Sequence, residues 1–343
     1  MPRTCFLLCW LAAFLLAGCA PGIAPPVLVG PETGGTLLLP PPPARARVRY
    51  LYSVRTAHGL RPGELPFRSP MAVTETGPGR FAVLEQADSY ILLLLTRGPG
   101  AEKTETKIKI IEPAAPGTSF SSLVDDAAAP DGTLYFTDSA LKKVFYLRKG
   151  SRDAKVFAPG HKFERPTGIA YDPVNGRIYV VDTLAHKVFA FDAAGKNKKI
   201  LEWGGRGTAD GKFNYPTYIT AGPRGDIYVS DTMNFRVQSF TPRGKFRFSL
   251  GGLGLGAGEF SDPKGVAVSP DGIVYVADAR RDLVEAFSSE GRYLFYFGSS
   301  GAAPGQFWQP SGIYVDKGGR IYACDYLNGR VQVFEPVEEK KKR

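Results

Sequence analysis

A motif that returns at a nearly constant interval constrains this chain more than any other feature. A short run rich in β-branched and aromatic residues closes on an aspartate at intervals of 49, 47 and 47 residues, at Asp182, Asp231, Asp278 and Asp325. Within each copy, short apolar runs are separated by turn-forming residues such as Pro270-Asp-Gly272, which indicates antiparallel strands joined by tight turns. A fixed period in the forties is typical of propellers and solenoids. The sequence therefore predicts an all-β fold made of four-stranded units.

The repeat resembles that of the NHL family, whose pattern runs from Gly-x-[Ile/Val]-Tyr-Val-x-Asp to Asn-x-Arg-[Val/Ile]. In this chain the pattern spans Gly225 to Val237, with Asn234 and Arg236, and again Gly319 to Val331, with Asn328 and Arg330. The resemblance covers about residues 45 to 336 and implies a six-bladed β-propeller. It does not imply one function, because NHL propellers include scaffolding proteins, RNA binders and lyases.

Six repeats can be placed along the chain, and the first two are degenerate. Repeat one starts at Pro70 and carries Glu85 where the others carry Asp, and repeat two starts at Ser122 and closes its second strand at Asp138. The other four start near Pro166, Pro216, Pro263 and Pro310. Six repeats predict one closed ring of roughly 290 residues.

The N-terminal strand is predicted to complete the last blade. Residues 48–54 align with the end of a repeat, and the last repeat stops after Phe334 without its fourth strand. Joining the first and last strands in one sheet closes the ring and removes exposed edges. We therefore assign residues 44–336 to the propeller and 337–343 to a charged C-terminal tail.

The N-terminus has the pattern of an exported lipoprotein. A basic start at Arg3 precedes the apolar run from Cys5 to Leu16, which is too short for a stable membrane span and indicates an export signal. The following Leu-Ala-Gly-Cys19 resembles a bacterial lipobox. That resemblance implies a signal peptide over 1–18, a diacylglycerol and a further acyl chain on Cys19, and, because Ala20 follows, the outer membrane. The alternative is an ordinary secretory signal.

Residues 19–43 are predicted to form a lipidated cysteine and an extended tether. The segment from 20 to 43 contains eight prolines, including the run Pro40 to Pro43, and almost no charge. Once the signal is removed and Cys19 is lipidated, only Cys324 remains free, so the fold must be held by its core rather than by a disulfide. We expect Cys324 to be a small buried residue rather than a nucleophile.

The repeated aspartates and the cations that follow them are the candidate site residues. Asp138, Asp182, Asp231, Asp278 and Asp325 end strands, where a carboxylate can accept hydrogen bonds from loop amides, so we expect a structural role. Five residues on, a long cation recurs at Lys143, Lys187, Arg236 and Arg330. With Asn234 and Asn328 these cations form a candidate binding face that could receive an anionic group. The alternative is that the cations pair with neighbouring carboxylates or stack on aromatic rings.

Three glycine-rich loops connect consecutive blades, over residues 204–213, 251–260 and 298–307. They recur once per blade and are not followed by a helix, so they indicate tight turns rather than a phosphate cradle. The phenylalanines that end them are expected to pin each loop between blades. They are Phe213, Phe260 and Phe307.

An enzymatic function finds little support in the residue pattern. NHL-like amidating lyases use a metal held by several histidines, but the three histidines here, His58, His161 and His186, do not share a blade position. The first-strand positions considered for a lactonase-like metal site are poor ligands for a hard cation: Thr167, Tyr218, Lys264 and Ser311. We predict no metal and no cofactor, and an amidating-lyase-like or lactonase-like activity stays open as the alternative.

The charge has to be weighed with the compartment. The formal net charge is +10, which in a cytoplasmic protein would point to nucleic acid. An exported lipoprotein meets little nucleic acid, so an envelope protein or an anionic polysaccharide is the better candidate partner. The sequence therefore predicts a membrane-anchored, extracytoplasmic binding or assembly module of the bacterial cell envelope.

Overall fold

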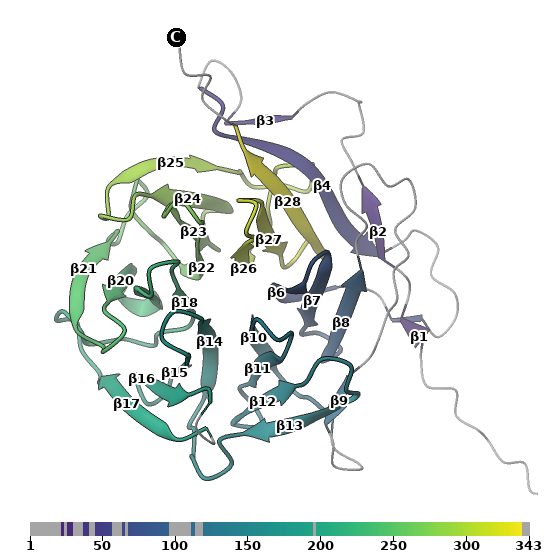
Figure 1. The fold of residues 1–343 in the computed structure, drawn as a ribbon. Helices are drawn as coiled ribbons and strands as arrows, with labels where there is room; N and C mark the ends of the chain where they lie inside the picture. Colours follow the sequence, from purple (N-terminus) through teal and green to yellow (C-terminus); the bar gives the residue numbers. More distant parts are fainter. Residues whose placement is uncertain are drawn as a thin grey trace, which may run out of the picture.

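The computed structural model describes residues 22–23, 26–29, 37–40, 45–56, 64–65, 68–95, 111–113, 119–194 and 197–337. Within them, six sheets are arranged radially around a central channel, with the first strand of each sheet innermost (Figure 1). This arrangement confirms the predicted all-β six-bladed propeller. Cys19, residues 1–18 and the last six residues of the charged tail lie outside the described residues. No helix in the described part of the chain is long and apolar enough to cross a membrane.

Blades 3, 4 and 5 are regular meanders in which four strands follow one another outward. Blade 3 contains β14 (Pro166–Asp172), β15 (Arg177–Asp182), β16 (Lys187–Asp192) and β17 (Lys199–Gly204). Blade 4 contains β18 (Ile219–Ala221), β19 (Ile227–Asp231), the 3₁₀ turn η1 (Thr232–Asn234), β20 (Arg236–Phe240) and β21 (Phe246–Leu250). Blade 5 contains β22 (Pro263–Val268), β23 (Val274–Asp278), β24 (Leu283–Phe287) and β25 (Tyr293–Phe297).

Blades 1 and 2 depart from this plan. Blade 1 has three strands among the described residues, β6 (Pro70–Gly77), β7 (Arg80–Glu85) and β8 (Tyr90–Leu95). Blade 2 contains β10 (Leu123–Ala128), β11 (Leu134–Asp138), β12 (Lys143–Leu147) and β13 (Asp153–Phe157). A short fifth strand, β9 (Glu112–Pro113), pairs in parallel with β13.

Blade 6 is assembled from both ends of the described chain. Its inner strands are β26 (Pro310–Val315), β27 (Ile321–Asp325) and β28 (Arg330–Pro336), and its fourth strand is β4 (Val48–Thr56). β4 runs antiparallel to β28, with Val331 opposite Val54. In Figure 1 the purple β4 lies directly beside the yellow β28. This is the pairing expected for a ring whose last blade takes its outer strand from the N-terminal region.

The expectation that residues 20–43 form only an extended tether is wrong. β2 (Pro26–Val29) and β3 (Leu38–Leu39) both pair antiparallel with β4, and β1 (Gly22–Ile23) pairs in parallel with β5 (Glu64–Leu65). Leu39 is buried in a cluster with Phe297 and Phe307. The prolines obscured short apolar runs that are well suited to cover the open edge of β4.

The core lies between adjacent blades. Phe213, Phe260 and Phe307 are fully buried, as expected of residues that fix the inter-blade loops. Each ends a loop closed by an isolated bridge, such as Leu253 to Phe260. Gly251 has φ +76°, and a Cβ there would lie 2.2 Å from the Phe260 ring, so only glycine fits this turn. The three inter-blade loops are therefore tight turns, each of which ends in a phenylalanine buried in the core.

Candidate functional site

The loop that follows the second strand of each blade lies against the loop that enters the first strand. In every blade the carboxylate that closes the second strand accepts a hydrogen bond at 2.7 Å from a backbone amide of the incoming loop. The pairs are Ser69–Glu85, Ser121–Asp138, Glu164–Asp182, Asn214–Asp231, Ser261–Asp278 and Trp308–Asp325. These bonds are what a structural role for the repeated aspartates requires. We call the surface formed by the two sets of loops the loop face.

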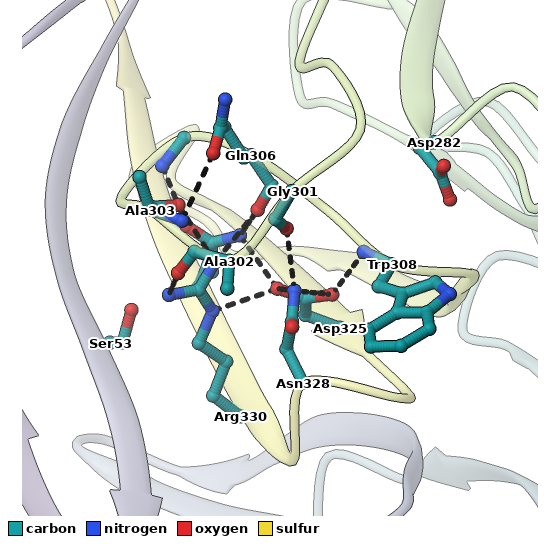
Figure 2. A network of polar contacts seen from close by, with 12 residues as sticks. Ser53, Asp282, Gly301, Ala302, Ala303, Gln306, Trp308, Asp325, Asn328 and Arg330 are labelled. Atoms are coloured by element: carbon teal, nitrogen blue, oxygen red, sulfur yellow. Dashed lines mark hydrogen bonds and ion pairs between the residues drawn. The ribbon is translucent and has the colours of Figure 1, made fainter.

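Blade 6 has the densest of these contacts (Figure 2). Asp325 Oδ2 accepts hydrogen bonds from Arg330 Nε at 2.7 Å and from Asn328 Nδ2 at 2.9 Å. The remaining guanidinium nitrogens of Arg330 donate to three carbonyls of the 298–307 loop at 2.7 to 2.9 Å, those of Ala302, Ala303 and Gln306. Burial raises the pKa of the Asp325 carboxyl, while the Trp308 amide and the Arg330 charge oppose that shift. Arg330 is only 6% exposed.

Blade 4 repeats the arrangement. Arg236 Nε lies 2.9 Å from Asp231 Oδ2, and its Nη2 donates to the carbonyls of Ala209 and Lys212. Asn234 Nδ2 donates to Gly207 O at 2.9 Å and to Asp231 Oδ2 at 2.8 Å. We call this Asp, Asn and Arg network, with the glutamine two residues after the Arg, the loop latch. Of the two interpretations of the repeated cations, the geometry of Arg236 and Arg330 matches the ion-pair alternative.

Blade 5 builds an equivalent latch from different residues. Leu283 occupies the arginine position, and Arg281 stands where blades 4 and 6 have asparagine. Arg281 Nη2 donates to Leu255 O at 3.0 Å, and Nη1 donates to Glu285 Oε1 at 2.6 Å and to Glu259 O. Glu285 replaces the glutamine of the other latches. Sequence spacing missed Arg281 because the cation has moved two positions along the loop.

Blades 2 and 3 have no such latch among their described residues. Lys143 is exposed at the start of β12. Lys187 Nζ pairs with Glu202 at 2.7 Å in a half-exposed contact that also includes Lys199, and the two lysines hold the pKa of Glu202 at about 2. The six candidate binding residues therefore divide into buried or partly buried latch residues in blades 4 and 6 and more exposed lysines in blades 2 and 3.

The loop face carries a set of large apolar side chains that are exposed to solvent. Leu253 and Leu255, on the loop that enters blade 5, are 70% and 77% exposed. The other members lie on the neighbouring loops of blades 3, 4 and 6. They are Leu184, Tyr215, Met233, Trp308 and Leu327. We call these seven residues the apolar set, and nothing in the repeat pattern singled them out.

The central channel holds two acidic residues that sequence reasoning missed. Asp125 and Asp126 on β10 line a cavity of about 160 Å³ that is bounded by the first strands of all six blades. Asp125 Oδ2 accepts a hydrogen bond from the Ile169 amide at 2.9 Å, whereas neither oxygen of Asp126 has a partner among the described residues. Burial raises the pKa of both carboxyls well above the usual range, and the Asp125 charge adds to the effect on Asp126.

Strand register explains why these acids were missed. Asp126 lies opposite Phe136, the position that Val73, Ile169, Ile219, Val266 and Ile313 fill in the other blades. The second repeat lacks the Pro-x-Gly-Ile opening that would have aligned it. The same register shows that Thr217, not Tyr218, is the counterpart of Thr167, Lys264 and Ser311.

The histidines that the structure describes do not form a site. His161 packs among the rings of Phe163, Phe189 and Phe191, and its burial and the Lys199 charge lower its pKa. His186 Nδ1 accepts a hydrogen bond from the Tyr215 amide at 3.1 Å. His58 lies outside the described residues. No group of three or more His, Cys, Asp or Glu that could hold a metal is found in the described ranges.

Cys324 is buried and free, as expected of a small core residue. Its burial raises the pKa of the thiol well above the ordinary value. A thiol held in its neutral form in the core is unsuited to nucleophilic chemistry.

Comparison with known proteins identifies the repeat and leaves the function open. The NHL repeat family matches residues 163–191, 260–287 and 307–334. Over 124 residues the chain is 32% identical to "Peptidyl-glycine alpha-amidating monooxygenase A" of Xenopus laevis, a match covering 32% of this chain and 13% of that protein. The corresponding mouse protein, of Mus musculus, is 30% identical over 125 residues, again 32% of this chain and 13% of the relative. The match thus spans about an eighth of these relatives.

Solved structures share the fold at low sequence identity. A streptogramin B lyase superposes with a TM-score of 0.58 at 16% identity, covering 80% of this chain and 95% of the lyase. An auxiliary nutrient binding protein from Bacteroides ovatus gives a TM-score of 0.61 at 14% identity, covering 81% and 72% of the two chains. Its counterpart from Bacteroides thetaiotaomicron gives 0.60 at 14%, covering 79% and 69%. This chain is therefore a six-bladed β-propeller that carries NHL repeats.

Proposed function

We propose that this protein is a membrane-tethered, extracytoplasmic binding module whose loop face docks a partner protein. One observation carries the proposal: the apolar set stands exposed on loops of blades 3 to 6. Leu253 and Leu255 share one loop, and Leu327 is hydrogen-bonded to Trp308, so the set includes two groups of neighbouring apolar side chains. Neighbouring exposed apolar side chains are typical of interaction surfaces. Aliphatic anchors such as Leu253 and Leu255 suit a protein partner better than a polysaccharide, which offers mainly hydroxyl groups.

The loops that present these anchors are held by internal contacts. The carbonyl oxygen of Leu255 accepts a hydrogen bond from Arg281 Nη2, and the neighbouring Gly256 amide donates to Glu259 Oε2 at 2.8 Å. Leu327 N donates to Trp308 O at 3.0 Å, which ties two members of the apolar set together. Because these loops are already ordered, docking on them costs little conformational entropy.

Charge narrows the kind of partner. Exposed basic residues of the loop face outnumber the exposed acidic ones, which are Asp88, Glu164, Asp210 and Glu259. The basic residues are Arg68, Lys142, Lys143, Lys162, Arg165, Arg206, Lys212 and Arg280. We infer a partner surface with an apolar centre and an acidic rim, whose association slows as salt screens the charges.

The tether sets how close this module would lie to the membrane. With a lipid on Cys19 and β2 beginning at Pro26, six residues lie between the anchor and the strand that pairs with blade 6. At about 3.5 Å per step from one Cα to the next, the distance from Cys19 to Pro26 is at most about 25 Å. The blade 6 edge would then be held near the outer membrane of a bacterial envelope. Two propellers of similar shape are described as auxiliary nutrient binding proteins of Bacteroides, so the scaffold serves binding there.

Removing the most exposed anchors tests the docking proposal. We expect the full-length double variant Leu253→Ser/Leu255→Ser to have the melting temperature of the wild type. After chemical cross-linking of envelopes and purification, the partner protein should be recovered with the wild type and not with this variant. Leu294→Ser on the outer strand β25, where the leucine is 39% exposed, is the matched control and should keep the partner. Equal recovery with all three proteins would contradict docking on the loop face.

The anchor has a separate test. Cys19→Ser should abolish metabolic labelling with a fatty acid and move the protein from the membrane fraction to the soluble fraction. A Cys19→Ser protein that still sediments with membranes would show that another feature holds it there.

The rival function is a lyase or hydrolase on the same ring, suggested by the names of the amidating and streptogramin relatives. Its tests are metal analysis of the purified protein and assays with amidating-lyase and lactone substrates. Stoichiometric metal together with turnover would replace the binding proposal by the enzymatic one.

A further inference from the structure

The cavity of the central channel is separate from the loop face and has an unusual wall. At the level of Asp126 the other five blades contribute only branched aliphatic side chains. The described lining includes no Lys, Arg or His. Asp126 is 8% exposed, and both its oxygens are shielded from solvent without a hydrogen-bond partner in the described structure. An ionised carboxylate so placed costs several kcal/mol unless a proton or a cation accompanies it.

Tyr218 closes one end of this cavity. Its side chain is 2% exposed, and its hydroxyl lies 3.5 Å from Met71 O of blade 1, on the far side of the channel. Exposure rises toward the opposite end of the first strands, where Tyr171 and Tyr314 are half-buried. The cavity therefore opens away from the loop face, and two aromatic rings line its approach.

The residues at hand select the class of ligand. Ca²⁺ prefers six to eight oxygen ligands, but Asp125 already accepts the Ile169 amide, which leaves one unpartnered carboxylate in an aliphatic ring. A small organic cation needs only one carboxylate and gains from aromatic faces. A volume of about 160 Å³ far exceeds the roughly 15 Å³ that one water requires.

We propose that the central channel binds a primary ammonium group, with Asp126 as its counter-ion and Tyr171 and Tyr314 along its path. Asp126 belongs to the cavity wall, and binding requires a change of its side-chain rotamer that presents the carboxylate to the lumen. Ligands of this class are alkylamines, polyamines and amine-bearing side chains or chain ends. No bond is made or broken.

The proton on Asp126 gives this site a signature. Burial favours the neutral acid, so a cation binds only as the proton leaves, and affinity for an amine that stays charged must rise with pH. The groups facing Asp126 that interact with it electrostatically are Asp125, Tyr218, Tyr314 and Cys324. Of these, only Asp125 is a carboxyl whose ionised form would reinforce cation binding, and burial raises its pKa as well.

The test is titration calorimetry of the full chain with methylammonium, putrescine and Ca²⁺ at pH 6 and pH 8. We expect both amines to bind more tightly at pH 8. Asp126→Ile, which gives blade 2 the residue type of blades 3, 4 and 6, should weaken amine binding at least tenfold without lowering the melting temperature. Asp126→Asn keeps the side-chain shape and should weaken amine binding by the same factor. The proposal can therefore still be tested if the isoleucine variant misfolds.

Glu164→Gln is the control, because it removes one exposed acid that is not part of the cavity lining and should bind like the wild type. The proposal is overturned if neither amine binds the wild type, if Ca²⁺ binds more tightly than putrescine, or if both Asp126 variants bind as the wild type does. Loop-face docking does not depend on any of these results.

Discussion

Blades 4 to 6 and blades 1 to 3 use the same fold in different ways. In blades 4 to 6 an arginine donates hydrogen bonds to backbone carbonyls of the incoming loop and so holds it in place. In blades 2 and 3 lysines take that position and stay near the surface, while β10 places two acids in the channel. From this difference we infer that the loop latches stabilise blades 4 to 6. In the other half, buried Asp125 and Asp126 lower the stability of the core.

Removing a latch arginine is the largest expected effect. Arg330→Ala should lower the free energy of unfolding by about 3–5 kcal/mol, because it removes the cationic partner of a buried carboxylate and leaves three loop carbonyls without their donor. Lys143→Ala, at the equivalent position of blade 2, should change it by less than about 0.5 kcal/mol. Urea denaturation of both variants checks this, and similar losses would erase the distinction between the two halves.

The blade 5 latch is expected to respond to pH through Glu285, a titratable group that the latches of blades 4 and 6 replace by glutamine. Burial raises the pKa of Glu285 to about 7, with Arg281 opposing the shift, so the folded state holds a proton that the unfolded state releases near pH 4.5. Stability should therefore fall as pH rises from about 4.5 to 7, by up to about 3 kcal/mol. Glu285→Gln, which copies Gln238 and Gln332, should flatten that slope in denaturation curves. Exposed Glu290→Gln serves as the control, and an unchanged slope in Glu285→Gln would refute the assignment.

The channel acid is expected to cost stability in the weaker half. Asp126→Ile should stabilise the ligand-free protein by about 2 kcal/mol near neutral pH, since it removes a buried acid without a partner. Because burial raises its folded pKa, the gain should be small below about pH 4 and should grow as pH rises. The dependence of this gain on pH is measured with the other groups that face Asp126 intact. They are Asp125, Tyr218, Tyr314 and Cys324. A gain that shrinks with rising pH would contradict this account.

The sequence predicted what is periodic and missed what is not. The spacing of the aspartates led to six blades, and the recurring Phe213, Phe260 and Phe307 led to buried plugs, because both are required once per repeat. The sequence pattern missed Arg281, because a guanidinium can reach the equivalent loop carbonyls from either of two positions. Asp126 escaped because its strand lacks the usual opening, and β2 and β3 escaped because prolines concealed short runs that only the open edge of β4 makes useful.

The docking of a partner on the loop face is tested most directly by cross-linking from defined positions. A photoreactive amino acid would be placed, one site at a time, at Leu255 and Trp308 on the loop face, at Val174 on the opposite face and at Leu294 on the outer edge of blade 5, in the full-length protein within intact envelopes. All four side chains are exposed, so access of the probe to solvent is matched. We predict one discrete protein adduct from Leu255 and Trp308 and none from the other two positions. An adduct from Val174 or Leu294 alone, or no adduct from any site, would contradict the proposal.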